Sequence, residues 1–208
     1  MEETFFMKSE SGITHIMDGF TRFLEEKFLP IAATLSQNRY LTSLRDGLVL
    51  SLPIMIVGSM VIVVAELPLD AYQNFMVSVF GENWKWWNWP VINASTMGIV
   101  ALIAVIGVSY ALAKSHDKTP LPAAAMSLSG YFILLHQLPD GGYGTTYFAA
   151  RGLFTAMVVA VVTAEVYNFV INKKLVITLP EQVPPAISAQ FTALIPAAFT
   201  TLLWVVVR

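Results

Sequence analysis

Residues 45–67 read RDGLVLSLPIMIVGSMVIVVAEL, and the nineteen residues between Asp46 and Glu66 include no ionisable side chain. At a rise of about 1.5 Å per residue, a helix of this length nearly spans the roughly 30 Å hydrocarbon core of a bilayer and satisfies its own backbone polar groups. A helix on a soluble protein shows a polar face, whereas Ser51 and Ser59 carry the only hydroxyl groups here. The pattern therefore predicts a transmembrane helix over residues 47–67.

The composition of the whole chain also favours a membrane protein. Of its 208 residues 56% are hydrophobic and 12% charged, against roughly 25% charged residues in soluble domains. A net charge of -2 gives no basic excess that would attract nucleic acid. The absence of cysteine excludes disulfides, thiolate metal sites and a phosphocysteine in this chain. The three histidines are widely spaced in the sequence, so we expect no metal site and no cofactor.

Four further apolar stretches predict an all-α, polytopic membrane domain over residues 47–208. Together with the first, the expected spans are 47–67, 91–113, 121–138, 152–172 and 187–207. The connection between the first two holds four tryptophans at positions 84, 86, 87 and 89. These predict an anchor at the membrane interface, with a platform for sugar stacking as the alternative. The Pro-Asp-Gly-Gly sequence at 139–142 predicts a turn or loop.

Residues 1–46 are predicted to form a cytoplasmic tail and an amphipathic helix. Residues 1–11 are polar and expected to be mobile, and from Ile13 to Ile31 apolar residues recur at helical spacing. This helix lies in the membrane interface or packs against a partner subunit. Pro30 is expected to end or kink it.

The basic residues predict the orientation of the chain. Nine lie on one side of the expected spans, and only Lys85, Arg151 and Arg208 lie on the other. Because basic residues favour the cytoplasmic side, we expect the amino terminus inside and the last span ending outside. With so little beyond that span, we expect a polytopic protein that has been cut short. The nine are Lys8, Arg22, Lys27, Arg39, Arg45, Lys114, Lys118, Lys173 and Lys174.

Few polar groups lie at membrane depth. Glu165 is about two turns inside the cytoplasmic end of its span, where a carboxylate needs a partner or a wet cavity, so it is a candidate ligand contact or a packing hydrogen bond. Glu66 snorkels to water or contacts a transported ligand. A third group lies near the outer face and lines an entrance or belongs to the interface. It consists of Asn93, Ser95, Thr96, His136 and Gln137.

Residues 179–196 read LPEQVPPAISAQFTALIP. Pro184 and Pro185 cannot both lie inside a regular helix, so the backbone is extended or broken just where the last span begins. Broken backbone at membrane depth is tolerated beside protein or a water-filled cavity, and it is therefore a candidate ligand contact. No nucleotide-binding loop, HExxH motif or Gly-x-Ser-x-Gly turn indicates a soluble enzyme.

This motif resembles the Pro-acid-x-Val-Pro-Pro-Ala-Val segment, followed by Phe-x-x-Leu-x-Pro, of enzyme IIC permeases of the phosphotransferase system, in the lactose, cellobiose and diacetylchitobiose branch. Two other segments resemble the same family in order and spacing. One is FLEEKFLPIAATLSQNRYLTSLRDGLVLSLPIMIVGS at 23–59, and the other is GLFTAMVVAVVTAEVY at 152–167. The resemblance covers nearly the whole chain but only the amino-terminal half of a family member.

The resemblance implies a multi-pass protein of a bacterial plasma membrane that carries a beta-linked disaccharide, such as cellobiose or diacetylchitobiose, inward. It implies a cytoplasmic IIB subunit as partner, on which the phosphoryl transfer itself takes place. A homodimer or a complementary carboxy-terminal half is a further expected partner. The alternative is a truncated, non-transporting scaffold or oligomerisation fragment. No catalytic residue is assigned. The candidate substrate-binding residues are Val183, Pro184, Pro185, Ala186, Ile187 and Glu165.

Overall fold

The computed structural model describes residues 21–22, 24–86, 89–180 and 182–208. The described residues form helices and connecting loops, with one isolated bridge between Gln137 and Tyr143, so the all-α prediction is confirmed. The chain divides into two compact units, of which the first ends at Thr42 and the second comprises Ser43–Arg208.

The first unit contains the described part of the predicted amphipathic helix. A π-helical turn, η1 (Leu24–Phe28), leads directly into α2 (Leu29–Ser36), and Pro30 lies in the first turn of α2. The helix therefore does not end at Pro30. Instead, the proline, which lacks an N–H donor, lies just after the change from the π-helical turn to the α-helix. Asn38 then starts the next helix, because its Oδ1 accepts hydrogen bonds from the backbone of Tyr40 (2.9 Å) and Leu41 (3.3 Å). Residues 1–20 lie outside the described residues.

The apolar stretch that opens the sequence forms two consecutive helices, α3 (Arg39–Val49) and α4 (Leu52–Ala65). They are separated at Ser51 because Pro53, in the first turn of α4, has no N–H to continue the hydrogen-bond ladder. In the second unit, α3 touches α7 (Val100–Ser115) backbone to backbone: a Cβ atom added at Gly47 would lie 2.3 Å from the amide nitrogen of Val108.

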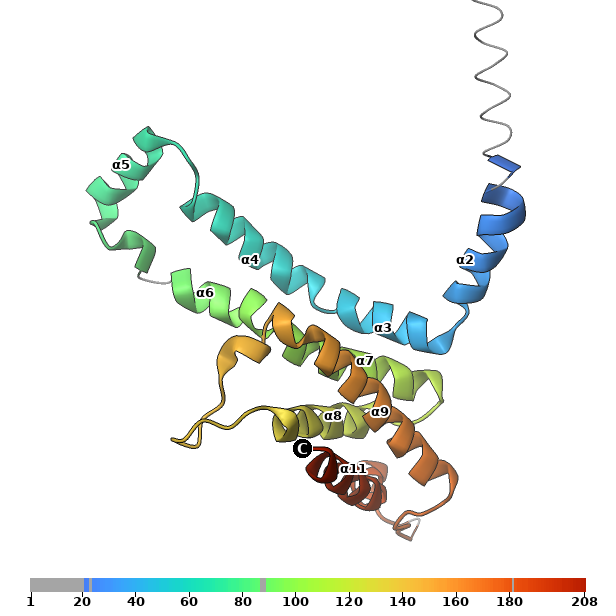
Figure 1. Ribbon diagram of the computed structural model, residues 1–208. Helices are drawn as coiled ribbons and strands as arrows, with labels where there is room; N and C mark the ends of the chain where they lie inside the picture. Colours follow the sequence, from blue (N-terminus) through green and yellow to red (C-terminus); the bar gives the residue numbers. More distant parts are fainter. Residues whose placement is uncertain (1–20, 23, 87–88, 181) are drawn as a thin grey trace, which may run out of the picture. The chain divides into compact units, whose positions relative to one another are not determined.

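The connection after α4 contains a helix that the sequence analysis did not predict, α5 (Asp70–Phe80), which ends at Gly81 with φ +86°. Beyond it lie η2 (Trp84–Trp86), α6 (Trp89–Ser95) and η3 (Met97–Ile99). Helix α6 runs beside α4 (Figure 1). The Nζ of Lys85 pairs with Glu66 at 3.3 Å, so this acid has a local cation as partner.

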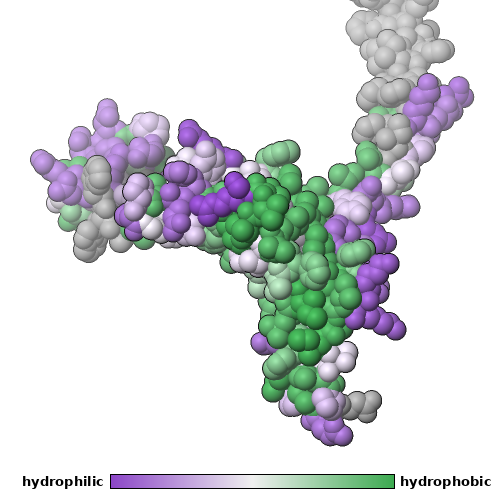
Figure 2. Space-filling model, turned by 60° about the horizontal axis from the view of Figure 1, so that its bottom comes forward, coloured by the Kyte–Doolittle hydropathy of each residue, from purple (hydrophilic) through white to green (hydrophobic). Residues whose placement is uncertain are grey.

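The core of the second unit is the bundle of α7, α8 (Pro120–Leu134), α9 (Leu153–Asn172) and α11 (Leu194–Val207), which Figure 1 shows gathered together. The buried residues of α7 and α9 include several small ones, and small side chains allow close helix packing in membranes. Outside the core, much of the face shown in Figure 2 is hydrophobic. The fully buried alanines include Ala101, Ala104, Ala156 and Ala160.

One buried side chain of α11 contacts two helices of this bundle. The Nε1 of Trp204 donates a hydrogen bond of 2.8 Å to Oγ1 of Thr163 on α9, and both residues are buried. The indole lies directly over Gly130 of α8, where a Cβ atom would lie 2.4 Å from Cδ1. Trp204 therefore holds α8, α9 and α11 together.

By length and composition, four of the described helical stretches can cross a membrane, namely Arg39–Ala65, Pro90–Ser115, Ala150–Asn172 and Ile187–Val207. The helix Pro120–Leu134 is apolar but shorter. It stops four residues before the end of the predicted span, and the chain turns at 139–140 as the Pro-Asp-Gly-Gly sequence predicts. The short helices η4 (Thr145–Tyr147) and η5 (Ala150–Gly152) then lead into α9.

Candidate functional site

The predicted break before the last span is present. Pro184 has an extended backbone (φ -52°, ψ 136°), and α10 (Pro185–Thr192) begins at the next residue. The carbonyl oxygen of Pro184 accepts hydrogen bonds from the amides of Ile187 (3.0 Å) and Ser188 (3.1 Å), so the first turn of α10 is closed. The side chain of Val183 is half-buried, whereas Ile187 is exposed. Whether these residues contact a sugar stays a prediction.

Glu165 is paired with a residue that the sequence analysis considered only as a metal ligand. Its Oε1 lies 3.1 Å from Nε2 of His116, the residue that ends α7. The side chains are 37% and 17% exposed, respectively. A carboxylate at this depth requires a partner, and His116 provides one. The hydrogen bonds and ion pairs given for the described residues do not join Glu165 to residues 182–188, so whether the two parts form one site stays a prediction.

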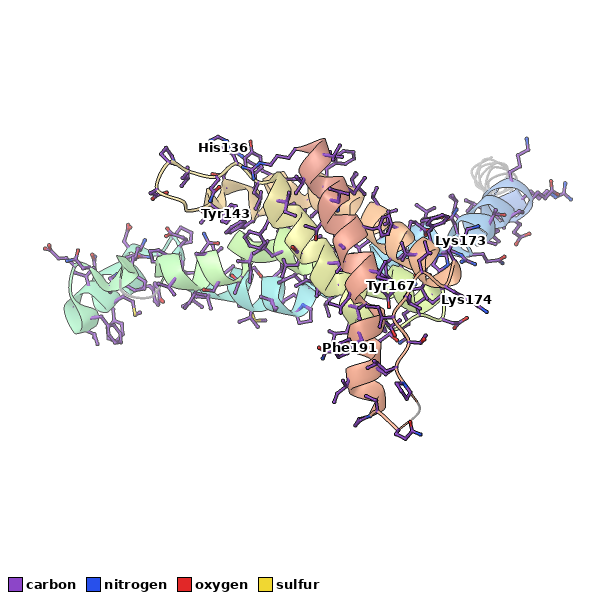
Figure 3. The ribbon with its side chains drawn as sticks, turned by 90° about the horizontal axis from the view of Figure 1, so that it is seen from below. His136, Tyr143, Tyr167, Lys173, Lys174 and Phe191 are labelled. Atoms are coloured by element: carbon purple, nitrogen blue, oxygen red, sulfur yellow. The ribbon has the colours of Figure 1, made fainter. Side chains whose placement is uncertain are left out.

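A second contact is made two residues further along α9. The hydroxyl of Tyr167 on α9 donates a hydrogen bond of 3.0 Å to the carbonyl oxygen of Thr119, the residue before α8. Together, the contacts of Glu165 and Tyr167 fix both ends of the α7–α8 loop against α9. Figure 3 shows Tyr167 on the same side of the bundle as Lys173 and Lys174, which follow α9.

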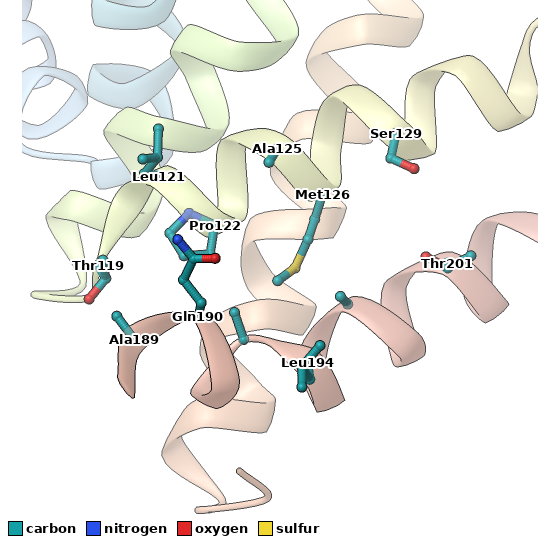
Figure 4. Close-up of a pocket in the computed structure, with 12 residues that line it drawn as sticks. Thr119, Leu121, Pro122, Ala125, Met126, Ser129, Ala189, Gln190, Leu194 and Thr201 are labelled. Carbon is teal, nitrogen blue, oxygen red and sulfur yellow. The ribbon is translucent and has the colours of Figure 1, made fainter. Parts of the chain in front are cut away.

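A groove of about 650 Å³ lies between α8 and the pair α10–α11 (Figure 4). Its walls are mainly apolar, and its polar members come from both sides. The sequence predicted the start of α10, but it did not indicate that α8 forms the other side of this groove. The groove is lined by Thr119, Leu121, Pro122, Ala125, Met126, Ser129, Ala189, Gln190, Ala193, Leu194, Ala197 and Thr201.

The opposite end of the bundle carries a smaller cavity of about 220 Å³, lined in part by His136. Figure 3 shows His136 and Tyr143 at the end away from Lys173. Of the other polar residues predicted near the outer face, Gln137 donates a hydrogen bond to the carbonyl oxygen of Gly141 (3.3 Å), and Thr96 donates to that of Ile92 (2.7 Å). These two side chains therefore stabilise the local backbone.

The tryptophan-rich connection is described in part. The ring of Trp84 meets Tyr72 edge to face with 6.3 Å between centroids, and Nζ of Lys85 lies 5.8 Å from the Trp84 ring centroid. A cavity of about 600 Å³ lies beside Trp84, between the end of α5 and η2. Trp87 lies outside the described residues. Both alternatives, interfacial anchor and sugar platform, stay predictions.

The comparisons with known proteins agree on one family. The sequence model described as "Phosphotransferase system, EIIC" matches residues 45–208. The cellobiose-specific EIIC component of Geobacillus stearothermophilus is 37% identical over 204 residues, which cover 91% of this chain and 45% of that protein. The lichenan permease IIC component of Bacillus subtilis (strain 168) is 36% identical over 203 residues, which cover 90% of this chain and 44% of that protein.

The structure is similar to the crystal structure of the transporter ChbC, the IIC component from the N,N'-diacetylchitobiose-specific phosphotransferase system. The TM-score is 0.80 with 34% sequence identity, and the match covers 90% of this chain and 46% of that one. The chain therefore spans slightly less than half the length of the relatives it matches.

Proposed function

The chain belongs to the EIIC family of the phosphotransferase system, and on this premise we propose that it is a membrane permease subunit that translocates a beta-linked disaccharide. The observation that carries the proposal is the family match over residues 45–208. The similar proteins are named for cellobiose, for lichenan and for N,N'-diacetylchitobiose, which favours cellobiose or diacetylchitobiose as the sugar.

Transport by this chain requires other components. Because the chain spans less than half of its relatives, a complementary carboxy-terminal half is one proposed partner, and a second copy of the chain in a homodimer is the other. Phosphoryl transfer takes place on a cytoplasmic IIB subunit, and the absence of cysteine from this chain is compatible with a phosphocysteine located there.

We further propose an orientation in the bacterial plasma membrane. The nine basic residues on the side of the amino terminus favour a cytoplasmic location for that end. The amphipathic helix in residues 1–46 then lies at the cytoplasmic interface, and residues 47–208 form the membrane domain with five spans. In this orientation the Glu165–His116 pair and the start of α10 face the cytoplasm.

The proposed sugar contacts are the backbone of residues 183–187 and the carboxylate of Glu165. The support for the first is the extended backbone at Pro184, which interrupts the helical hydrogen-bonding pattern at the beginning of the last span. The support for Glu165 is its incomplete burial, since the side chain is 37% exposed while it contacts His116. A displaced or reoriented His116 would leave the carboxylate available to sugar hydroxyls.

Calorimetry on the purified, detergent-solubilised chain tests the proposal. Cellobiose and diacetylchitobiose are titrated into the chain alone and into the chain co-expressed with the carboxy-terminal half of a related permease, with the alpha-linked disaccharide maltose as control. Saturable binding of a beta-linked sugar supports the proposal. Its absence from a folded complex of both halves contradicts it and favours the non-transporting scaffold.

Two variants address the site itself. Pro184→Ala and Glu165→Gln are expected to weaken binding of the beta-linked sugar, because the first frees the φ angle of residue 184 at the break and the second removes the carboxylate charge. Pro68→Ala, in an exposed connection far along the chain from the break, is the matched control and is expected to leave binding unchanged. Equal affinities of all three variants and the unmodified chain would remove these residues from the site.

A further inference from the structure

The groove between α8 and α10–α11 has walls that suit close packing of another helix. Four of its lining residues are alanines, one on α8 and three on the α10–α11 side, and small side chains let a neighbouring backbone approach closely in a membrane. Its rims are large and uncovered: Leu121 is 71% exposed and Leu194 is 52% exposed. These features alone fit lipid as well as protein.

The polar side chains in the groove favour a protein occupant over lipid. Among the residues that the structure describes, the side chains of Ser129, Gln190 and Thr201 take part in no hydrogen bond. Figure 4 shows these three side chains around the groove, with Gln190 beside Pro122. An unsatisfied polar group in the hydrocarbon region is costly, and acyl chains offer no partner for it.

Neighbouring side chains on the same helices behave differently. The hydroxyl of Ser127 donates to the carbonyl oxygen of Ala123 at 2.9 Å, and that of Thr200 donates to Ala197 at 3.1 Å. Thr192, two residues after Gln190, donates to Ser188 at 2.9 Å. These three hydroxyls outside the groove are satisfied within their own helix, whereas Ser129, Gln190 and Thr201 keep their hydrogen-bonding capacity for an occupant.

We propose that the groove is the docking site for a transmembrane helix of the carboxy-terminal half, and that this helix presents hydrogen-bonding side chains to Ser129, Gln190 and Thr201. The inference rests on the proposed function, since it assumes that the missing part of a permease completes this chain. The similar proteins carry more than half of their length beyond the part matched here.

Site-specific photo-cross-linking tests the docking site. The photoreactive residue p-benzoylphenylalanine replaces Leu121 or Leu194 at the groove, or Phe199 as the matched control on α11, which is 50% exposed but does not line the groove. Each variant of the full chain is co-expressed with the carboxy-terminal half of the Geobacillus stearothermophilus cellobiose-specific component and irradiated in membranes. Cross-linked products are identified by their mass.

A product containing both halves from positions 121 and 194, at several times the yield from position 199, supports the proposal. Products with lipid alone, products with a second copy of the chain, or equal yields from all three positions overturn it. Failure of the two halves to co-purify also overturns it. Sugar binding is measured on the same complex, so a cross-linked complex that binds no sugar contradicts the proposed function and leaves the docking site in place.

The hydrogen-bonding part of the proposal has its own test. Gln190→Met keeps the length of the side chain and removes its amide, and Gln182→Met makes the same change in the exposed loop before α10. Gln190→Met is expected to lower the amount of co-purified carboxy-terminal half about threefold, the effect of one average interhelical hydrogen bond in a membrane. Equal co-purification by the two variants would exclude a hydrogen bond from Gln190 to the docked helix.

Discussion

Gly130 marks the place where α8 approaches the indole of Trp204 on α11. A Cβ atom at position 130 would lie 2.4 Å from Cδ1 and 2.6 Å from Nε1 of Trp204, about 1 Å inside an ordinary contact. The indole cannot move aside freely, because its Nε1 donates the 2.8 Å hydrogen bond to Thr163. Gly130→Ala must therefore break this bond or push α11 away from α8.

The expected cost follows from these two effects. Overpacking of a tight contact costs about 1–3 kcal/mol, and loss of a hydrogen bond between membrane helices costs roughly 0.6–1.7 kcal/mol. Replacing a helical glycine by alanine stabilises the helix by about 1 kcal/mol, which offsets part of this cost. We expect the free energy of unfolding to fall by about 1–3 kcal/mol, which lowers Tm by roughly 3–9 °C for a chain of this size.

The assay is size-exclusion chromatography of the detergent-solubilised chain after heating, which gives Tm from the loss of the folded peak. Gly144→Ala is the matched control, because no atom lies within 4 Å of a Cβ added there. In a Trp204→Phe background the cost of Gly130→Ala should shrink, since the clashing ring atoms and the donor are gone. Equal Tm values for Gly130→Ala, Gly144→Ala and the unmodified chain would refute the assigned contact.

Three further changes test other contacts by the same assay. Gly47→Ala places a Cβ atom 2.3 Å from the amide nitrogen of Val108 and should lower Tm by several degrees, because neither backbone can yield; a Tm equal to that of Gly144→Ala would contradict the α3–α7 contact. His116→Ala leaves Glu165 without its described partner and should lower Tm by about 2–4 °C, an effect that disappears in a Glu165→Leu background if the pair is the cause. Glu66→Gln should leave Tm nearly unchanged, since the exposed pair with Lys85 contributes at most about 1 kcal/mol, and a large fall would show a burial that the structure lacks.

The backbone break at the last span was predictable because its cause is local. Two consecutive prolines remove two N–H donors and restrict the preceding residue, so no tertiary contact is needed to interrupt a helix at Pro184. The membrane character of residues 45–67 was predictable for the same reason, since length and apolarity belong to the stretch itself. The division of that stretch at Ser51 depends on Pro53, a signal that was present in the sequence.

Contacts between distant residues were not predictable from the same sequence. The depth of Glu165 demanded a partner, but nothing in the pattern selected His116, which is 49 residues away. The groove likewise depends on the packing of α11 against α8, which includes the contact of Trp204 with Gly130. Helix α5 was not predicted because Asp70–Phe80 mixes polar and apolar residues and lies in a connection between two expected membrane spans.

The central claim is that this chain forms the amino-terminal half of a working sugar permease. The most direct test is phosphoenolpyruvate-dependent uptake of labelled cellobiose by bacteria that lack their own cellobiose permease and express a cognate IIB subunit. We predict phosphorylated cellobiose inside the cells when this chain and a carboxy-terminal half are expressed together, and none when either is expressed alone. A folded, co-purifying complex of the two halves that gives no uptake above the strain lacking this chain would contradict the claim.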